Sequence, residues 1–365
     1  MRQSTRFILE SDSELKVVGE AGNGMEAITL VGRLRPDVIT MDIRMPKMDG
    51  FEAIRQIMAE HPAPIIVVTS ADLDREAHIS SQAARLGAVH VMKRPEGTAA
   101  AGYKAFAAKL IEQVKLMSTV RVVHRLCPQS RSGAGLSPSA ASPALPITPS
   151  GPPPLRGGHG QGTLGATLPM ARVGVAPVKT DIVAIGSSTG GPAALHKILS
   201  ELPADFPTPI VIVQHISFGF VEGLASWLDT ASPLQVKVGK QGERMQPGNV
   251  YIAPDGHHML VDRFGKISLN EAEMVGGFRP SVTPLFDSVA RANGSAAMGV
   301  ILTGMGTDGA VGMQNLHQAG AITLAQDQAS CVVFGMPKEA IALGAIQHIV
   351  PLDKVAQKMT ELVVV

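Results

Sequence analysis

The stretch VAIGSSTGGP, residues 183–192, decides the fold of the second half of this chain. A short apolar run ends in a cluster of Gly, Ser and Thr, and the amphipathic stretch PAALHKILSEL follows at 192–202. This order predicts a buried β-strand, a tight turn and a helix. A turn of this composition either binds a phosphate or presents a nucleophile, and the rest of the chain must decide between the two.

The turn lacks the spacings of the common phosphate-binding loops. No Lys completes G-x-x-x-x-G-K-[ST], and the G-x-G-x-x-G pattern is also missing. Gly186, Ser188 and Gly190 instead form G-x-S-x-G, the pattern of a nucleophile elbow. This signal is weak alone, because serines in such turns often only cap the following helix.

Residues at the ends of two other apolar runs favour the nucleophile. A serine hydroxyl needs a histidine base, which a carboxylate in turn orients. His215 ends PIVIVQH (209–215), and Asp308 lies on a second Gly-rich turn after MGVILTG (298–304). The C-terminal ends of neighbouring parallel strands share one edge of a sheet, so we expect Ser188, His215 and Asp308 to meet there.

Three other histidines are weaker candidates for the base. His257 and His258 fall in the turn of a hairpin-like insertion, GNVYIAPDGHHMLVDRFGKISLNE (248–271), and we expect them at the surface. His196 lies on the helix predicted at 192–202, where we expect it to be packed or partly exposed.

Both halves of the chain alternate strands and helices, which predicts α/β folds with doubly wound parallel sheets. In the second half, further strands are predicted at 321–326 and 346–352 and helices at 310–320 and 337–344. In the first half, strands are predicted at LKVVGEA (15–21), DVITMD (37–42), PIIVVTS (64–70) and AVHVMK (88–93), with helices at 24–34, 50–61 and around 77–87. Asp42, Thr69 and the tripeptide KRP (93–95) lie at three of these strand ends.

Between the halves the composition shifts to Pro, Gly, Ser and Ala, which is typical of a flexible linker. We therefore predict one domain at 1–117, a linker at 118–178 and a second domain at 179–365.

Composition excludes several classes of protein. Residues 181–365 carry 11 Lys and Arg against 16 Asp and Glu, and aromatic residues make up 4% of the chain, which argues against nucleic-acid binding. No apolar run approaches the ~20 residues of a membrane span, and the N-terminus MRQSTRFILESDSELK does not resemble a signal peptide. Cys127 and Cys331 are too few for a disulfide framework. We expect a cytoplasmic monomer without membrane insertion.

The segment DVITMDIRMPKMDGFEAI (37–54) resembles the phosphoacceptor segment of response-regulator receiver domains, which have a flavodoxin-like fold. The resemblance implies that Asp42 accepts a phosphoryl group from a histidine kinase and that Thr69 contacts a phosphoryl oxygen. The family has a lysine directly before a proline, where this chain has Arg94 with Lys93 one position earlier. Which of the two contacts the phosphoryl group stays open.

The resemblance to receivers begins within their first helix. The first strand, and the acidic pair that holds Mg²⁺ after it, have no counterpart in this sequence, and Asp49 is no obvious replacement. That strand is central in the 2-1-3-4-5 order, so its loss leaves a gap of about 10 Å. We expect either a start site placed too far downstream or a degenerate receiver, with little Mg²⁺-dependent phosphorylation of the 365 residues.

The motifs AIGSSTGGP, VQH, FRPSVTPLF, ILTGMGTDG and CVVFGMPKEAI resemble the chemotaxis protein-glutamate methylesterases over nearly all of 180–360. The resemblance implies a Ser188–His215–Asp308 triad that needs no cofactor, with Mg²⁺ expected only for receiver phosphorylation. Its implied substrates are glutamyl methyl esters and specific glutamines of methyl-accepting chemotaxis receptors. The usual alanine before the nucleophile is Ser187 here, a change expected to be harmless.

Three further residues are predicted to assist this chemistry. We expect the Met305 amide to bind the oxyanion and the Thr189 hydroxyl to add a contact. Arg279 is expected either to meet an acidic receptor helix or to form a structural ion pair.

Rival readings of the chain have less support. A response regulator with a DNA-binding output needs a basic face, which the acidic second half lacks, and a catalytically dead module needs a lost triad residue. An alternative within the enzyme class is a receiver-linked serine hydrolase that acts on another ester and has lost phosphorylation control.

Overall fold

The computed structural model describes residues 2–69, 82, 83, 86, 88, 90–95, 101–118 and 180–363. The described residues between 2 and 118 are called the first segment, and residues 180–363 are called the second segment. The predicted linker lies outside the described residues apart from Ser118, so the domain boundaries at 117 and 179 stay predictions. Each helix in the described ranges is too short or too polar to cross a membrane.

The first segment contains a parallel sheet in the order β1-β2-β3, formed by β1 (Ile39–Met41), β2 (Ile65–Thr69) and β3 (His90–Lys93). All five residues of β2 are buried, which explains its continuous apolar run, because a central parallel strand is covered on both faces. Alternate residues point to opposite faces, with Val67 in one core and Ile66 in the other. This is the parallel α/β arrangement that the sequence predicted.

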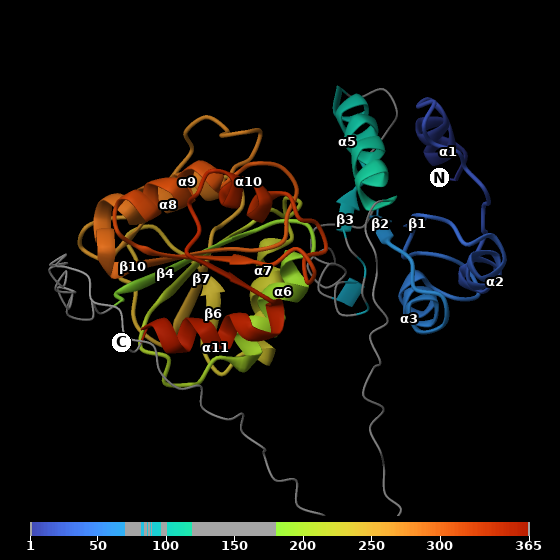
Figure 1. Ribbon diagram of the computed structural model, residues 1–365. Coiled ribbons are helices and arrows are strands. Elements are labelled where there is room, and N and C mark those ends of the chain that lie inside the picture. The colour runs from blue at the N-terminus through green and yellow to red at the C-terminus, as the bar shows by residue number, and fades with distance from the viewer. Residues whose placement is uncertain are drawn as a thin grey trace, which may run out of the picture. The chain divides into compact units, whose positions relative to one another are not determined.

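Helices cover both faces of this sheet, as Figure 1 shows in blue and teal. They are α1 (Arg2–Glu10), α2 (Gly24–Leu34), α3 (Gly50–Glu60) and α5 (Ala101–Ser118). Ala27 and Ile54 of α2 and α3 pack on the Val67 side, whereas Ile8 and Leu110 of α1 and α5 pack on the Ile66 side. The predicted helices at 24–34 and 50–61 are confirmed, and most of the one around 77–87 lies outside the described residues.

The strand predicted at 15–21 is wrong, because these residues are irregular in the structure. In the described ranges β1 pairs only with β2, and residues 15–21 pair with no strand. A strand is stabilised by hydrogen bonds to a partner strand, so a β-rich stretch without one does not form it.

The second segment is built on a seven-stranded parallel sheet in the order β12-β11-β10-β4-β5-β7-β6 (Figure 1). Its strands are β4 (Ile182–Ser187), β5 (Ile210–Gln214), β6 (Gln235–Val238), β7 (Asn249–Ile252), β10 (Ala297–Ile301), β11 (Ile322–Gln326) and β12 (His348–Val350). The chain starts in the middle at β4, builds β5, β7 and β6 on one side, and then returns to build β10 on the other. The C-terminal edge of β4 is therefore the topological switch point, where ligands bind in open α/β sheets.

The two faces of this sheet are covered by different helices (Figure 1). One core packs Ile185 against α6 (Gly191–Glu201), α7 (Val221–Ala231) and α11 (Leu352–Val363). The other packs Ala184 against α8 (Val282–Asn293), α9 (Ala310–Gln318) and α10 (Met336–Ala342), with the short 3₁₀-helix Gly294–Ala296 after α8. This confirms the doubly wound fold.

The insertion at 248–271 is only partly the predicted hairpin. β8 (His258–Val261) and β9 (Ile267–Asn270) form an antiparallel pair, but β7 joins the large sheet in parallel between β5 and β6. Three consecutive residues of β7, Val250, Tyr251 and Ile252, are almost fully buried, as a strand covered on both faces requires. The sequence analysis also did not identify β6, which pairs with β7.

A histidine whose Nε2 is buried is predicted to make the first segment sensitive to acid. His90 pairs in register with Ile66, which packs with Leu110 of α5, so both side chains share one face. Its Nε2 is buried and has no hydrogen-bond partner among the described residues. Burial, aided by the charge of Lys109, lowers the pKa of His90 to about 4.

We predict that this segment becomes less stable as the pH is lowered, because of His90. The ring is protonated below pH ~6.5 in the unfolded chain but only below pH ~4 in the folded chain. The free energy of unfolding therefore has its full value above pH ~6.5 and declines by up to about 3 kcal/mol as the pH is lowered to ~4 and below. His90→Val should remove most of this decline. Hydrogen–deuterium exchange of β2 and β3, corrected for intrinsic rates, measures it, with β4 and β5 as the internal reference. An equal decline in the variant would contradict the assignment to His90.

Candidate active site

Ser188 lies on the turn between β4 and α6, at the switch point of the large sheet. Gly190 has a φ of 79°, a left-handed conformation that favours glycine. A Cβ on Gly191 would lie 1.9 Å from Oε1 of Gln214, so no larger residue fits without movement. The GSSTGG sequence thus forms the sharp strand–turn–helix connection that the spacing predicted.

His215 follows β5 directly, and its ring faces Asp308 in the loop after β10. The distance from His215 Nε2 to Asp308 Oδ2 is 2.8 Å, and the two side chains are 5% and 4% exposed. The structure therefore joins two of the three predicted triad residues directly. The third, Ser188, directly follows β4, which lies between β5 and β10 in the sheet.

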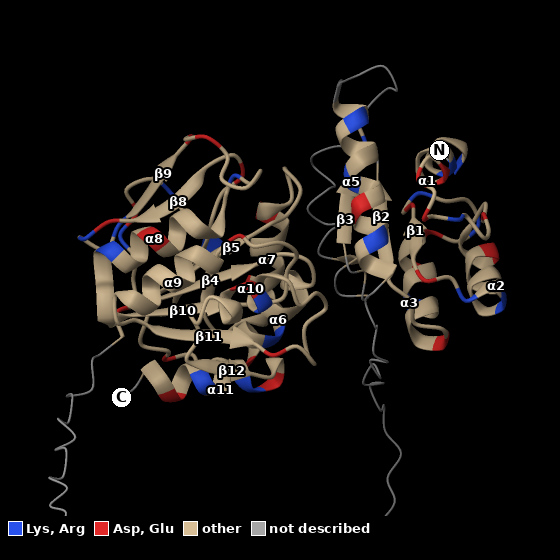
Figure 2. Ribbon diagram, turned by 45° about the horizontal axis from the view of Figure 1, so that its top comes forward, with Lys and Arg blue, Asp and Glu red and all other residues tan. Residues whose placement is uncertain are grey.

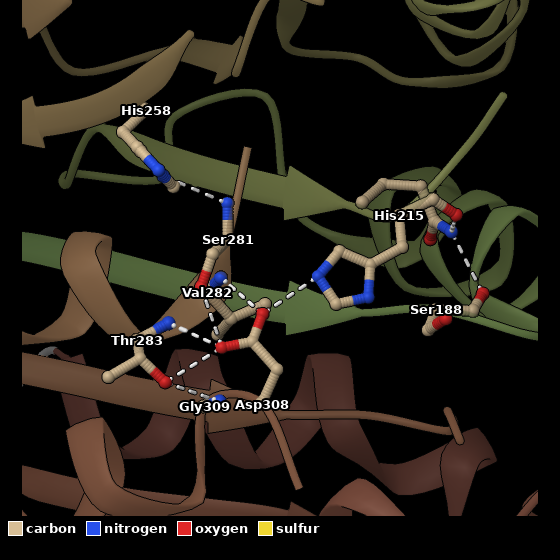
Figure 3. A network of polar contacts seen from close by, with 9 residues as sticks. Ser188, His215, His258, Ser281, Val282, Thr283, Asp308 and Gly309 are labelled. Atoms are coloured by element: carbon tan, nitrogen blue, oxygen red, sulfur yellow. Dashed lines mark hydrogen bonds and ion pairs between the residues drawn. The ribbon is translucent and has the colours of Figure 1, made fainter. Parts of the chain in front are cut away.

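Five hydrogen bonds hold the Asp308 carboxylate (Figure 3). Oδ2 accepts from His215 and from the Val282 amide at 2.7 Å. Oδ1 accepts from the hydroxyls of Ser281 and Thr283, each at 2.7 Å, and from the Thr283 amide at 3.0 Å. The carboxylate thus occupies the N-terminus of α8, where free amides favour a negative charge.

These bonds keep Asp308 ionised at neutral pH. Burial alone raises the pKa of Asp308, but the hydrogen bonds from His215, Thr283 and Val282 outweigh it and hold the pKa well below its ordinary range. An ionised carboxylate can only accept, so Nε2 of His215 carries a hydrogen and the neutral ring keeps its lone pair on Nδ1.

Nδ1 of His215 is buried and has no hydrogen-bond partner among the described residues. Figure 3 shows this nitrogen on the side of the ring away from Asp308, toward Ser188. One face of the imidazole stacks on Phe278, with ring centroids 3.8 Å apart and planes 1° from parallel. The ring is thus fixed by a hydrogen bond to Asp308 at one edge and by an aromatic ring on one face, and its free lone pair is on the serine side.

Gln214 connects the turn that carries Ser188 to His215. Its Nε2 donates to the carbonyl oxygens of Ser188 and His215, both at 2.8 Å, and its Oε1 accepts from the Ser187 hydroxyl at 2.7 Å. Ser187 and Gln214 are 0% and 2% exposed, so these bonds are shielded from water. The sequence analysis did not identify Gln214, although it lies inside the quoted VQH motif.

The other predicted site residues are placed around this centre. Gly304, which directly precedes the Met305 amide, packs against Ser188, since a Cβ on Gly304 would lie 2.8 Å from Cβ of Ser188. That amide donates to no acceptor in the described residues. Thr189 is buried, and its carbonyl accepts from Thr303 Oγ1 at 2.9 Å.

Within the described residues, Arg279 does not form the structural ion pair that was one of its two predicted roles. Its Nη1 donates to the carbonyl oxygens of Glu271 and Ala272 at 2.8 and 3.1 Å, and it has no carboxylate partner among the described residues. Its Nε is buried without a partner there. The guanidinium charge is therefore not neutralised by an acidic side chain of the described chain.

The prediction that His258 lies at the surface is wrong. His258 starts β8 and is 2% exposed, because the insertion folds over α8, as Figure 2 shows. Ser281 donates its amide hydrogen to Nδ1 of His258, one step from Asp308. His257 is half-buried beside Glu271, and His196 stacks on Trp227, which agrees with the packed position predicted for it.

In the first segment, Asp42 follows β1 and Thr69 ends β2, where it is buried. Burial raises the pKa of Asp42, while backbone amides and the charges of Arg44 and Arg94 oppose the rise. Arg94 therefore acts on Asp42, whereas Lys93 is exposed on β3. Asp49 caps α3 by accepting from the Glu52 amide at 2.9 Å.

The residues around Asp42 do not fit the Mg²⁺ that receiver domains use. The described ranges hold no group of three or more His, Cys, Asp or Glu side chains that could bind a metal, and Asp49 is engaged as a helix cap.

Comparison with known proteins agrees with this architecture. Residues 183–359 match the CheB methylesterase family, and residues 1–101 match the response regulator receiver domain. The protein-glutamate methylesterase/protein-glutamine glutaminase 4 of Myxococcus xanthus is 44% identical over 97% of this chain and 91% of its own length. The protein of that name from Nitrosospira multiformis is 43% identical over 100% of this chain and 94% of its own.

A solved structure, the CheB methylesterase catalytic domain of Thermotoga maritima, is 42% identical and covers 51% of this chain and 100% of that one, with a TM-score of 0.49. Identity above 40% to the full-length relatives, together with their nearly complete coverage, establishes the family. The chain belongs to the protein-glutamate methylesterase/protein-glutamine glutaminase family, with a response regulator receiver segment followed by a CheB methylesterase segment.

Proposed function

We propose that this chain hydrolyses glutamyl methyl esters of methyl-accepting chemotaxis receptors, releasing methanol, and deamidates specific receptor glutamines. The observation that carries the proposal is the buried His215–Asp308 pair at the switch point, with the unpartnered Nδ1 on the Ser188 side. Family membership supports the substrate class. Since the glutamates modified by this family lie on cytoplasmic receptor helices, we place the enzyme in the cytoplasm.

The mechanism uses Ser188 as nucleophile and His215 as general base. Ser188 Oγ attacks the side-chain carbonyl carbon while its proton passes to Nδ1 of His215. The tetrahedral intermediate then expels methanol, which takes that proton and leaves an acyl-serine. Water, deprotonated by His215, releases glutamate and restores Ser188, and a glutamine substrate follows the same course with ammonia as the leaving group.

The neighbouring groups stabilise charge as it develops. Asp308 stabilises the imidazolium that forms on His215 without taking its proton. We assign the Met305 amide as an oxyanion donor, a contact typically worth ~10²–10³ in rate, and the Thr189 hydroxyl as a second contact. Arg279, whose charge lacks a carboxylate partner among the described residues, is assigned to the acidic receptor helix.

The receiver segment is proposed to control the esterase through Asp42, with a chemotaxis histidine kinase as phosphodonor. Thr69 and Arg94 are assigned as the contacts of the phosphoryl group. The charge of Arg94, which opposes the raised pKa of Asp42, supports Arg94 in this role.

We predict that Ser188→Ala abolishes methanol release from methylated receptor membranes, because loss of a triad nucleophile typically costs ~10⁶ in kcat. The release of labelled methanol from the full chain and the variant measures this loss. Retention of most of the activity would remove Ser188 from the mechanism.

Ser187→Ala is the matched control, since Ser187 is the adjacent serine. It should keep most of the activity but lose about 1–3 kcal/mol of stability, because Oε1 of Gln214 then has no donor. Chemical denaturation followed at Trp227 measures the stability. A Ser187→Ala variant as inactive as Ser188→Ala would show that the nucleophile was misassigned.

Asp308→Asn is predicted to lower kcat by about 10⁴ at neutral pH, because an amide favours the wrong imidazole tautomer. Steady-state rates with the same receptor membranes provide the measurement. A loss smaller than about tenfold would mean that another group orients His215.

Arg94→Ala is predicted to raise the pKa of the Asp42 carboxyl further, because it removes a positive charge that favours the carboxylate. Carbon-13 NMR titration of the Asp42 side chain measures the shift. Lys93→Ala serves as the control and should give a smaller shift. A larger shift in the lysine variant would transfer the assignment to Lys93.

A further inference from the structure

His258 bridges two segments of backbone that flank the site. Its Nδ1 accepts the amide hydrogen of Ser281 at 3.2 Å, and its Nε2 lies 3.0 Å from the carbonyl oxygen of Glu273. An amide nitrogen can only donate and a carbonyl can only accept. The ring must therefore be neutral with its hydrogen on Nε2, because protonation at Nδ1 would break the bond to Ser281.

The Ser281 side of this bridge leads directly to the catalytic carboxylate. Ser281 is the N-cap residue of α8, yet its hydroxyl does not cap the helix and instead donates to Oδ1 of Asp308. Asp308 takes over the capping, since it accepts from the amides of Val282 and Thr283. The position of the Ser281 backbone therefore determines how Ser281, Val282 and Thr283 donate hydrogen bonds to Asp308.

The Ser281 amide precedes the helix and needs a partner of its own, because a buried unpaired amide is costly. His258 supplies that partner from β8, which is in turn attached to α8 by a bond from the Val261 amide to Ser288 Oγ at 3.0 Å. Ser281 and His258 are 0% and 2% exposed, so the hydrogen bond between them is buried.

We propose that His258 is a positioning residue that holds Asp308, through Ser281, in the orientation that His215 needs. The inference rests on the function proposed above. The chain of contacts runs from His258 to Ser281, from Ser281 to Asp308, and from Asp308 to His215, as Figure 3 shows.

The Glu273 side of the bridge is less important for this role. Nη1 of Arg279 already holds the neighbouring carbonyls of Glu271 and Ala272. Loss of the bond from His258 to Glu273 thus leaves that part of the segment anchored, whereas Ser281 has no second acceptor for its amide among the described residues.

Two conservative variants separate the two ends of the bridge. The side-chain oxygen of Asn at 258 reaches the position of Nδ1 and can still accept from the Ser281 amide. The longer amide of Gln reaches the position of Nε2 and can still donate to Glu273, but it offers no acceptor at the Nδ1 position. Asn therefore keeps the bond to Ser281, and Gln keeps the bond to Glu273.

We expect His258→Gln to lower kcat by about 10- to 100-fold with little change in KM, because misplacing a catalytic group by about 1 Å can cost that much. His258→Asn should retain most of the activity of the full chain. The measurements are methanol release from methylated receptor membranes and the rate at which a fluorophosphonate labels Ser188. Addition of Ser281→Ala to His258→Gln should cost less than the product of the separate losses, because both act on Asp308.

Equal losses of kcat in the Asn and Gln variants would overturn the proposal, as would lower thermal stability in both with unchanged kcat. Labelling separates this result from failure of the proposed function. If the wild-type chain reacts with the fluorophosphonate but releases no methanol, the substrate assignment is wrong. The ratio of labelling rates in the two variants then still decides the role of His258, with Ser188→Ala as the unlabelled control.

Discussion

The catalytic segment depends on one buried carboxylate. An ionised side chain that is 4% exposed is costly unless every lone pair is used, and Asp308 accepts five hydrogen bonds. Four come from residues 281–283 at the start of α8. The same charge that orients His215 therefore also caps the N-terminus of a helix. Catalytic geometry and the docking of α8 onto the sheet are therefore one structural feature.

Two glycines allow the backbone to approach closely enough for this arrangement. A Cβ on Gly186 would lie 2.3 Å from Val282, and one on Gly309, whose φ is 86°, would lie 2.7 Å from the same side chain. Val282 is the residue whose amide binds Asp308. These two glycines are thus explained by the packing of α8 against β4 and against the loop after β10.

The sequence predicted the fold class, most strands and the meeting of His215 with Asp308, because strand ends in a parallel sheet share one edge. The prediction of a strand at 15–21 was wrong because β-propensity gives no information about whether a partner strand exists. β7 was misread because a buried parallel strand and a hairpin strand have similar apolar content.

His258 and Gln214 were missed for a different reason. His258 binds the backbone amide of Ser281, and Gln214 binds the backbone carbonyl of Ser188. In each pair the two residues are far apart in the sequence. Backbone acceptors and donors have no side-chain signature, so no motif spacing indicates them. Histidine and glutamine side chains are also often found at the surface, so the residue types alone do not indicate these buried contacts.

Two buried polar atoms at this site lack partners among the described residues, namely His215 Nδ1 and Arg279 Nε. Each unpaired buried group typically costs about 1–3 kcal/mol, so a fold optimised only for stability would pair or replace them. The surrounding groups are paired, including the Asp308 carboxylate and the Gln214 amide. The two exceptions are a proton acceptor beside the serine and a cation without a carboxylate. A proton acceptor beside a serine is what ester hydrolysis requires, so the unpaired atoms are best explained by a substrate that completes the site.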